Sequence, residues 1–346
     1  MKKYYSDILS TLKEDDTKLG LNDRVLLIDG LNTFIRAFVM NPSTNDDGIH
    51  VGGIKGFLLS IGYAIKNIKP TRVIICFDGA GGSQRRRKLL PEYKQNRKVN
   101  RKLLRAAHQQ DSAEDNRLAM KNQMQRLLNY LSNCPITLAT IDKIEADDSI
   151  AYICKQLLSN SKCFIMSSDK DFIQLVDKRI TVWSPTKKKY YFQNDVKDEF
   201  ELRPENYILY KCLLGDKGDN VPGIRGLGHK SLIKYLPILF GTDVLTLEDI
   251  IEYAKTNSIP SRQLDLIKDN EEKLYLNYKL MQLHEADISG SAKERLQNIV
   301  KAPIPSFVKY DFMKMLLEDR MQIVKNIEFW IRDVFLSLDT KAKYDK

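Results

Sequence analysis

Nine acidic residues stand at positions from which they could act together on one substrate. Seven follow short apolar runs in the first half of the sequence, and two lie in a later glycine-containing stretch. They are Asp29, Asp78, Glu145, Asp147, Asp148, Asp169, Asp171, Asp216 and Asp219. Carboxylates that share a site of reduced dielectric repel one another, so such a set needs cations to neutralise it. Hard divalent cations such as Mg²⁺ prefer oxygen ligands, and two of them can hold the attacking and leaving oxygens of a phosphodiester.

The elements that would bring these acids together are the strands of a mostly parallel sheet. Four apolar runs alternate with helical patterns, which is typical of an α/β domain. The runs are 24–30, 71–79, 134–141 and 162–169. Helices are expected at 51–70 and 147–160, and a strand or hairpin at 179–192. Ligands of open α/β sheets bind outside the carboxyl ends of the strands, so we expect the acids to converge there.

Each acid taken alone has a simpler explanation. A single aspartate after a strand is most often a turn residue or a helix N-cap, and this favours a structural role for Asp29 or Asp78 in isolation. Asp147 and Asp148 begin a helix, where acids complement the helix dipole, so capping and metal binding are equally compatible with them. Asp148 fits a cap best. The recurrence at four successive strand ends favours the metal site, because chance capping explains one or two cases and not all.

The basic residues are concentrated in one segment. Ten Lys or Arg and one acid lie between Gln84 and Arg105, so the segment carries +9 within a chain whose net charge is +10. Such a run is usually a solvated helix face or a disordered tail. Beside an anionic metal site it could instead hold a phosphate backbone. Pro91 argues against one unbroken helix here.

A glycine-rich stretch at 220–236 is a second candidate for nucleic-acid contact. Gly223, Gly226 and Gly228 allow a tight turn between helices, with backbone N–H groups free to face a phosphate. His229 and Lys230 begin the next helix. Contacts of this kind go to the backbone of the nucleic acid and carry little sequence preference.

Composition excludes several classes of protein. The 346 residues are 43% hydrophobic, and no apolar run is long enough to span a membrane. The five cysteines contain no CxxC pair, so neither a zinc site nor a disulfide framework is indicated. The four histidines are far apart, which argues against a histidine metal site or a serine triad. The N-terminus lacks an apolar signal core, so we expect a cytoplasmic protein.

Several motifs, in this order, resemble the 5′-nuclease family, which includes flap endonucleases and the exonuclease domain of bacterial DNA polymerases. They are LLIDG, CFDG, IEADD, SSDKDF and GDKGDNVPGIRGLGHKS. The resemblance covers roughly residues 25–235. It implies a PIN-like α/β core with a helical arch insertion and a mostly helical C-terminal region containing a helix–turn–helix. The implied parts are an extension at 1–22, a core at 23–200 with its arch at about 84–125, and a C-terminal region at 201–346 with the helix–turn–helix at about 212–236.

The resemblance also implies roles for particular residues. Asp29, Asp78, Glu145, Asp147 and Asp169 would hold the tighter metal ion, Asp171 and Asp219 would extend towards a second, and Asp148 and Asp216 would be outer acids. Lys94 and Arg97 would stabilise the charge that develops at the scissile phosphate. The residues expected to contact nucleic acid are Arg86, Arg87, Lys88, Tyr93, Lys98, Gly223, Gly226, Gly228, His229 and Lys230. For Tyr93, stacking on a base and packing at the base of the arch are equally compatible with the sequence.

The implied function is that of a 5′-to-3′ exonuclease and flap endonuclease with two Mg²⁺ ions, giving 5′-phosphate products. Mn²⁺ is expected to substitute, and K⁺ is a candidate ligand of the helix–turn–helix. The motif combination most resembles the branch found in T-even-type phages, whose members remove RNA primers during DNA replication. The implied partners are DNA with 5′ flaps or ends and RNA/DNA hybrids, with a single-stranded DNA-binding protein or another replication protein as a further candidate. A monomer is expected.

Three alternatives remain at this point. A PIN-type ribonuclease shares the acidic cleft, but it would lack both the basic insertion and the glycine turn. A non-catalytic protein that binds DNA structures would use the same basic elements, but it should have lost one or more of the acids. A metal-dependent phosphatase acting on small molecules would not need the cationic segment.

Overall fold

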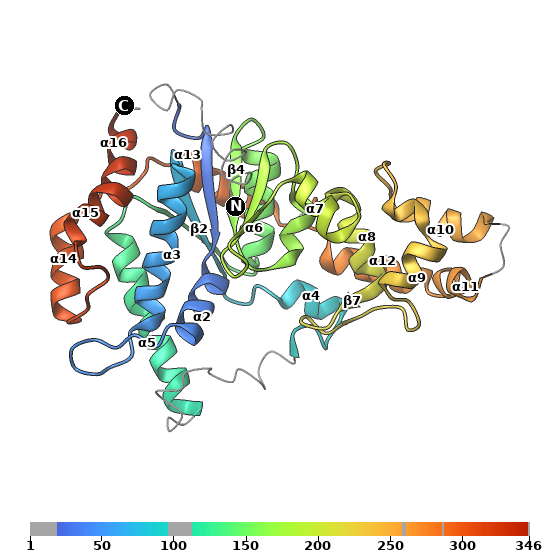
Figure 1. The fold of residues 1–346 in the computed structure, drawn as a ribbon, viewed down its shortest axis with the longest axis horizontal. Coiled ribbons are helices and arrows are strands. Elements are labelled where there is room, and N and C mark those ends of the chain that lie inside the picture. The colour runs from blue at the N-terminus through green and yellow to red at the C-terminus, as the bar shows by residue number, and fades with distance from the viewer. Residues whose placement is uncertain (1–18, 96–112, 258–260, 286, 345–346) are drawn as a thin grey trace.

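The computed structural model describes residues 19–95, 113–257, 261–285 and 287–344 (Figure 1). Its centre is a six-stranded sheet with the strand order β3-β2-β1-β4-β5-β6. The strands are β1 (Arg24–Asp29), β2 (Arg72–Asp78), β3 (Thr137–Ile141), β4 (Lys162–Met166), β5 (Ile180–Ser184) and β6 (Lys189–Tyr191). Strands β1 to β5 are parallel, and β6 pairs with β5 as an antiparallel hairpin. The predicted mostly parallel sheet is therefore confirmed.

Helices cover both faces of this sheet, which is why its central strands are apolar throughout rather than alternating. Successive residues of β1 point to opposite faces. Leu26 and Ile28 pack into the core that includes helices α2 (Gly30–Met40), α3 (Gly52–Ile68) and α5 (Ala113–Ser132). Val25 and Leu27 pack into the core on the other face. That second core includes α6 (Ala146–Tyr152), η3 (Ile153–Leu157) and α13 (Gly290–Lys301).

The two helices expected from the sequence are present with adjusted ends. The pattern at 51–70 forms α3, which ends at Ile68 just before Pro70. The pattern at 147–160 begins as α6 and continues as a π-helical turn over Ile153–Leu157. Among the described residues, none of the helices combines the length and apolarity needed to cross a membrane.

The last helices of the chain return to the sheet. They are α14 (Lys309–Glu318), α15 (Ile327–Ile331), η7 (Arg332–Leu336) and α16 (Ser337–Tyr344). Phe312, Trp330 and Phe335 share a core with Phe57 and Ile61 of α3, and Figure 1 shows these helices beside α3. The region after residue 201 is helical as predicted, but its final third is part of the core of the sheet.

The middle of the C-terminal region forms a lobe with its own core, on the right in Figure 1. Its elements are η5 (Pro204–Asn206), α8 (Tyr207–Leu214), β7 (Gly215–Asp216), β8 (Val221–Pro222), α9 (His229–Tyr235), η6 (Pro237–Phe240), α10 (Leu247–Thr256), α11 (Arg262–Lys268) and α12 (Glu271–Met281). The segment predicted as a helix–turn–helix is helix α8, a two-stranded hairpin of β7 and β8, and helix α9. Helices α4 (Gln84–Leu89) and α7 (Gln193–Phe200) and the 3-10 helix η4 (Lys170–Leu175) complete the described elements.

Gly223 is the position at which this hairpin meets the end of α8. A Cβ atom there would lie 2.1 Å from the carbonyl oxygen of Leu214, which is backbone and has little room to move. We therefore expect Gly223→Ala to lower the free energy of unfolding by about 2 kcal/mol or more, since overpacking strains the backbone. Gly228→Ala is the matched control, because a Cβ atom added at Gly228 would have no neighbour within 4 Å. Equal thermal melting of the two variants would contradict this packing argument.

Candidate active site

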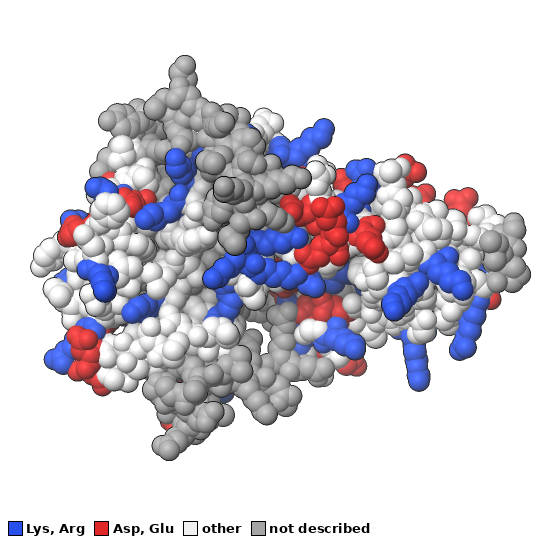
Figure 2. All heavy atoms as spheres, in the orientation of Figure 1, with Lys and Arg blue, Asp and Glu red and all other residues white. Residues whose placement is uncertain are grey.

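A cavity of about 590 Å³ lies at the carboxyl edge of the sheet. Four of the predicted acids line it: Asp29, Asp78, Asp147 and Asp169. Asp29 and Asp78 are the last residues of β1 and β2, Asp147 lies in the first turn of α6, and Asp169 follows β4. The parallel strands thus bring together carboxylates that are up to 140 residues apart in sequence. Figure 2 shows acidic side chains gathered beside basic ones near the middle of this face of the molecule.

Asp29 is held at the edge of the cavity by two donors. It is the N-cap of α2, and its Oδ1 accepts a hydrogen bond from the backbone N–H of Asn32 at 3.0 Å. The hydroxyl of Ser167 donates to its Oδ2 at 3.0 Å. Burial, together with the charges of Asp169 and Asp78, raises the pKa of Asp29 to about 7. Asp29 therefore has both roles considered for it, as a helix cap and as an acid facing the cavity.

The other cavity acids are fixed in a similar way. The backbone N–H of Ala146 donates to Asp78 Oδ1 at 2.7 Å, which joins the start of α6 to the end of β2. Asp169 Oδ1 accepts from the N–H of Asp171 at 2.9 Å. Burial and the nearby charges of Asp29 and Asp169 raise the pKa of Asp147. The acids are thus crowded enough to destabilise one another's charge, as expected of a site that takes up cations.

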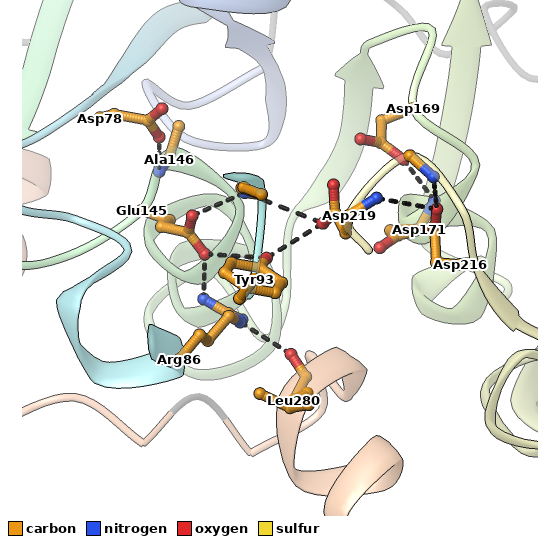
Figure 3. A network of polar contacts seen from close by, with 12 residues as sticks. Asp78, Arg86, Tyr93, Glu145, Ala146, Asp169, Asp171, Asp216, Asp219 and Leu280 are labelled. Atoms are coloured by element: carbon orange, nitrogen blue, oxygen red, sulfur yellow. Dashed lines mark hydrogen bonds and ion pairs between the residues drawn. The ribbon is translucent and has the colours of Figure 1, made fainter. Parts of the chain in front are cut away.

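Glu145 lies behind this cavity and is paired with cations of the basic segment (Figure 3). Its Oε1 is 2.6 Å from the ammonium of Lys94, and its Oε2 is hydrogen-bonded to the guanidinium of Arg86. Lys94 also lines the cavity. Lys94 is therefore both the ion-pair partner of Glu145, a predicted metal ligand, and a lining residue of the acidic cavity.

Arg86 is buried, with 3% of its surface exposed. It binds both oxygens of Asp148, with Nη1–Oδ2 at 2.7 Å and Nη2–Oδ1 at 2.8 Å, and its Nε donates to the carbonyl of Leu280 at 2.7 Å. The prediction that Arg86 contacts nucleic acid is therefore wrong for this structure, because its guanidinium is enclosed by protein groups. Asp148 faces Arg86 and is not among the cavity-lining residues, so the structure gives it a place in this ion pair.

Removing the charge of Arg86 should destabilise the protein strongly. Arg86→Met would leave the buried Asp148 with the longer contact to Arg85, at 3.4 Å, and would remove the guanidinium from one oxygen of Glu145. Breaking a buried pair of this kind typically costs about 3–5 kcal/mol. We expect a lowered midpoint of urea unfolding for Arg86→Met and a nearly unchanged one for Arg87→Met, since Arg87 is exposed on the same helix. An Arg86→Met variant as stable as the wild type would show that the ion pair is unimportant.

Tyr93 is buried as well, with 3% of its surface exposed. Its hydroxyl donates to Asp219 Oδ2 at 3.0 Å, and the next residue, Lys94, donates its backbone N–H to the Asp219 carbonyl at 2.9 Å. Of the two roles considered for Tyr93, the structure supports packing at the base of the basic segment and not stacking on a base. These bonds join the basic segment to the hairpin between α8 and α9.

Asp171 and Asp216 form a second acidic group with Lys211 of α8. The Lys211 ammonium is 2.6 Å from Asp216 Oδ2 and is also hydrogen-bonded to Asp171 Oδ1. Burial and the charge of Asp169 raise the pKa of Asp171 to about 7. Although burial opposes it, the charge of Lys211 lowers the pKa of Asp216 below its usual value. Figure 3 shows Asp171 and Asp216 close together, with Asp169 next to them.

The donor set fits hard divalent cations. Within the described ranges, no three Asp, Glu, His or Cys side chains already surround a single point as a closed set of ligands. Mg²⁺ does not need such a set, because it usually keeps several waters and binds one or two carboxylates directly. Four carboxylates on one cavity supply the required oxygen ligands. A bound cation would offset the burial and mutual repulsion that raise the pKa values of Asp29 and Asp147.

The residues predicted to contact nucleic acid differ in how exposed they are. Arg87, Lys88 and Lys230 are exposed, whereas His229 lies between the hydroxyl of Tyr210 and the carboxylate of Glu201, 3.3 Å from each. Of the three predicted glycines, Gly223 is half-buried beside α8, whereas Gly226 and Gly228 are exposed in the turn before α9. Gly226 has a φ of +98°, a left-handed conformation that favours glycine. Arg97 and Lys98 lie outside the described residues.

Sequence reasoning missed several residues of the site. Arg36 lines the cavity from α2, and Ser168 and Thr186 line it with their hydroxyls 2.6 Å apart. Lys211 was not singled out either. The position of Arg36, two turns of helix after Asp29, could have indicated it, because that spacing places both residues on one face of α2. Nothing in the sequence pairs Thr186 with Ser168, since the hairpin of β5 and β6 brings them together.

The strand order and the acidic cavity at the carboxyl edge define the class of this protein, which is that of α/β proteins with the 5′-nuclease fold. The crystal structure of bacteriophage T5 D15 flap endonuclease (D155K), a pseudo-enzyme-product complex with DNA and metal ions, superimposes with a TM-score of 0.58. The two proteins are 22% identical, and the match covers 86% of this chain and 99% of that one. At this identity the likeness shows the fold alone.

Sequence comparison places the chain more closely. A family model described as 5′-3′ exonuclease, N-terminal resolvase-like domain, matches residues 24–201. Flap endonuclease Xni of Shewanella sediminis is 30% identical over 264 residues, which are 75% of this chain and 91% of that protein. The 5′-3′ exonuclease of Aquifex aeolicus is 29% identical over 271 residues, which are 78% of this chain and 84% of that protein. The chain belongs to the 5′-3′ exonuclease family, and the predicted enzyme class of 5′-3′ exonucleases and flap endonucleases is confirmed at this level.

Proposed function

We propose that this protein is a Mg²⁺-dependent nuclease that cuts DNA flaps and RNA/DNA hybrids from the 5′ side and removes RNA primers during phage-type DNA replication. The observation that carries the proposal is the convergence of Asp29, Asp78, Asp147 and Asp169 on one cavity at the sheet edge. The resemblance of the motifs to the RNase H of T-even-type phages supports the assignment to primer removal. T5 D15 flap endonuclease was crystallised with DNA and metal ions, which supports the same class of substrate and cofactor.

The cavity acids would hold the first cation, and Asp171, Asp216 and Asp219 would serve a second. When bound, such cations lower the pKa of water and neutralise the charge on a phosphate. The role of the protein is to fix the carboxylates: hydrogen bonds from Asn32, Ser167 and Ala146 hold Asp29 and Asp78 in place before any ligand arrives. Mn²⁺ would substitute for Mg²⁺, and K⁺ would bind at the turn between α8 and α9.

Lys94 would act on the substrate directly. Lys94 lines the cavity, and its ammonium would stabilise negative charge that develops there on a phosphate oxygen. Arg97 would act with it, as the family resemblance implies. The exposed side chains of Arg87, Lys88 and Lys230, with Lys98 and the glycine turn, would hold the phosphate backbone on either side of the cut. The candidate protein partner is a single-stranded DNA-binding protein or another replication protein. The protein would act as a monomer in the cytoplasm.

The proposal is tested with a 5′-flap duplex and a 5′-RNA/DNA hybrid, each labelled at one end or the other. With Mg²⁺ we expect short products released from the 5′ side of both substrates, ending in 5′-phosphates on the retained strand, and no cleavage in EDTA. Cleavage of the flap without the hybrid would overturn the assignment to primer removal. Tight binding without cleavage in any divalent cation would overturn the enzyme and leave a protein that binds DNA structures.

A further inference from the structure

Lys211 is a buried cation placed between two acids that come from different elements. It lies on α8 with 8% of its surface exposed. Its ammonium is 2.6 Å from Asp216 on β7 and is hydrogen-bonded to Asp171 on the 3-10 helix η4 (Lys170–Leu175). A lysine side chain in water would be free to move, whereas this one is enclosed between its two partners. The role of Lys211 therefore depends on these two carboxylates.

Both carboxylates are also fixed by their own turns. Asp216 Oδ1 accepts from the backbone N–H groups of Gly218 and Asp219, at 2.7 and 3.2 Å. The backbone N–H of Asp171 donates to Asp169 Oδ1 at 2.9 Å, which fixes the start of η4 beside the cavity. Since the turns already fix the positions of the two acids, the main contribution of Lys211 is its positive charge, which offsets the repulsion between the carboxylates. Without it, two partly buried carboxylates would face each other, which is costly.

We propose that Lys211 is an internal counter-ion that holds Asp171 and Asp216 together in the metal-free enzyme and that a second divalent cation must displace it. The inference rests on the proposed metal-dependent function. The two acids with the lysine carry a net charge of −1, whereas the two acids alone carry −2 and would match a divalent cation. The ammonium also repels any cation that approaches the same oxygens.

The cavity acids differ in this respect. Asp29 and Asp78 are held by hydrogen bonds from Asn32, Ser167 and the backbone of Ala146, and their oxygens face a cavity. The lysine on this cavity, Lys94, is hydrogen-bonded to Glu145, so a cation can bind Asp29 and Asp78 without displacing it. Lys211 therefore makes the two cation sites unequal in affinity. The first site binds a cation without displacing a lysine. The second binds one only when a high free cation concentration, or a bound phosphate, offsets the free energy needed to displace the ammonium.

The experiment is a titration of the metal-free protein with Mn²⁺, in which free Mn²⁺ is followed by electron paramagnetic resonance. The wild type should show one tighter and one weaker class of site. In Lys211→Met we expect the weaker class to tighten by about tenfold or more, because one opposing charge has been removed, and the tighter class to stay the same. The matched control is Lys155→Met, which removes a lysine paired with Asp177 at 3.0 Å, away from the cavity-lining residues.

A second variant covers the case in which Lys211→Met does not fold. Lys211→Gln keeps an N–H donor for the acids while removing the charge, so it should show the same tightening of the weaker class. If the folded variants bind Mn²⁺ with unchanged or weaker affinity at the weaker class, the counter-ion role is wrong while the proposed function stands. A wild-type protein that binds no Mn²⁺ at all would overturn both.

Discussion

Asp169→Asn is expected to lower the rate of Mg²⁺-dependent cleavage of a 5′-flap substrate by about 10³-fold or more. Asp169 lies on the cavity wall, and its charge acts together with those of Asp29 and Asp147. Asparagine keeps the size of the side chain and the oxygen that accepts from the N–H of Asp171, so the fold should be retained. What is lost is a negative charge that a divalent cation needs. The rate should be measured under single-turnover conditions, so that product release does not hide the chemical step.

DNA binding provides the control for this variant. Because the proposed phosphate contacts are basic residues and not Asp169, we expect Asp169→Asn to bind the flap substrate in EDTA as tightly as the wild type, or more tightly. Asp142→Asn removes an exposed acid from the turn after β3, at the same edge of the sheet, and should cleave normally. If the Asp169→Asn variant keeps more than about a tenth of the wild-type rate, Asp169 does not belong to the metal site.

Lys94→Met should lower kcat by about 10²-fold with little change in KM. The ammonium of Lys94 lies 2.6 Å from Glu145 Oε1, and Lys94 lines the cavity in which the proposed cleavage would develop negative charge. Methionine keeps the apolar stem over the ring of Tyr93, whose centroid is 5.0 Å from the ammonium. The variant therefore removes the charge and keeps most of the packing, while Glu145 retains its pair with Arg86.

The split between kcat and KM distinguishes this role from simple backbone binding. Lys88→Met removes an exposed cation from the neighbouring helix α4 and should raise KM slightly while leaving kcat unchanged. If Lys94→Met instead behaves like Lys88→Met, then Lys94 contributes to binding and has no special part in the chemical step. Circular dichroism of both variants would confirm that the fold is retained.

The acidic cavity could be predicted from the sequence because a simple rule connects the two. Residues that follow parallel strands lie at the same edge of a sheet, so Asp29, Asp78 and Asp169 were expected to meet. The strand order needed no separate prediction, because β1, β2 and β4 are adjacent in the sheet. The local periodicity also predicted α3 and the start of α6, since both helices bury an apolar face.

The partners of the acids could not be predicted, because charge alone does not say which cations are buried. Arg86 belongs to a run of basic residues that looks like exposed surface, yet it is enclosed between Asp148, Glu145 and the end of α12. Lys170 is next to both Asp169 and Asp171 in sequence, but its ammonium lies over the ring of Phe200. The cation that pairs with Asp171 is Lys211, 40 residues further along the chain.

These partners depend on how the helical lobe meets the sheet. Helix α8 carries Lys211 to Asp171, and the hairpin after α8 carries Asp219 to Tyr93. Such contacts between segments far apart in sequence leave no periodic pattern, so only the folded structure shows them. The same reasoning explains why Tyr93, an aromatic residue in a basic run, is a packing residue and not an exposed platform for bases.

The most direct test of the acidic cavity is a crystal of the protein soaked with Mn²⁺, measured at a wavelength at which manganese scatters anomalously. We predict an anomalous peak in the cavity bounded by Asp29, Asp78, Asp147 and Asp169, and its loss in Asp169→Asn crystals. A second, weaker peak near Asp171 and Asp216 should appear at higher Mn²⁺ concentration. Crystals soaked to saturation that show no peak among the four cavity acids would contradict the assignment of this edge of the sheet as the metal-binding active site.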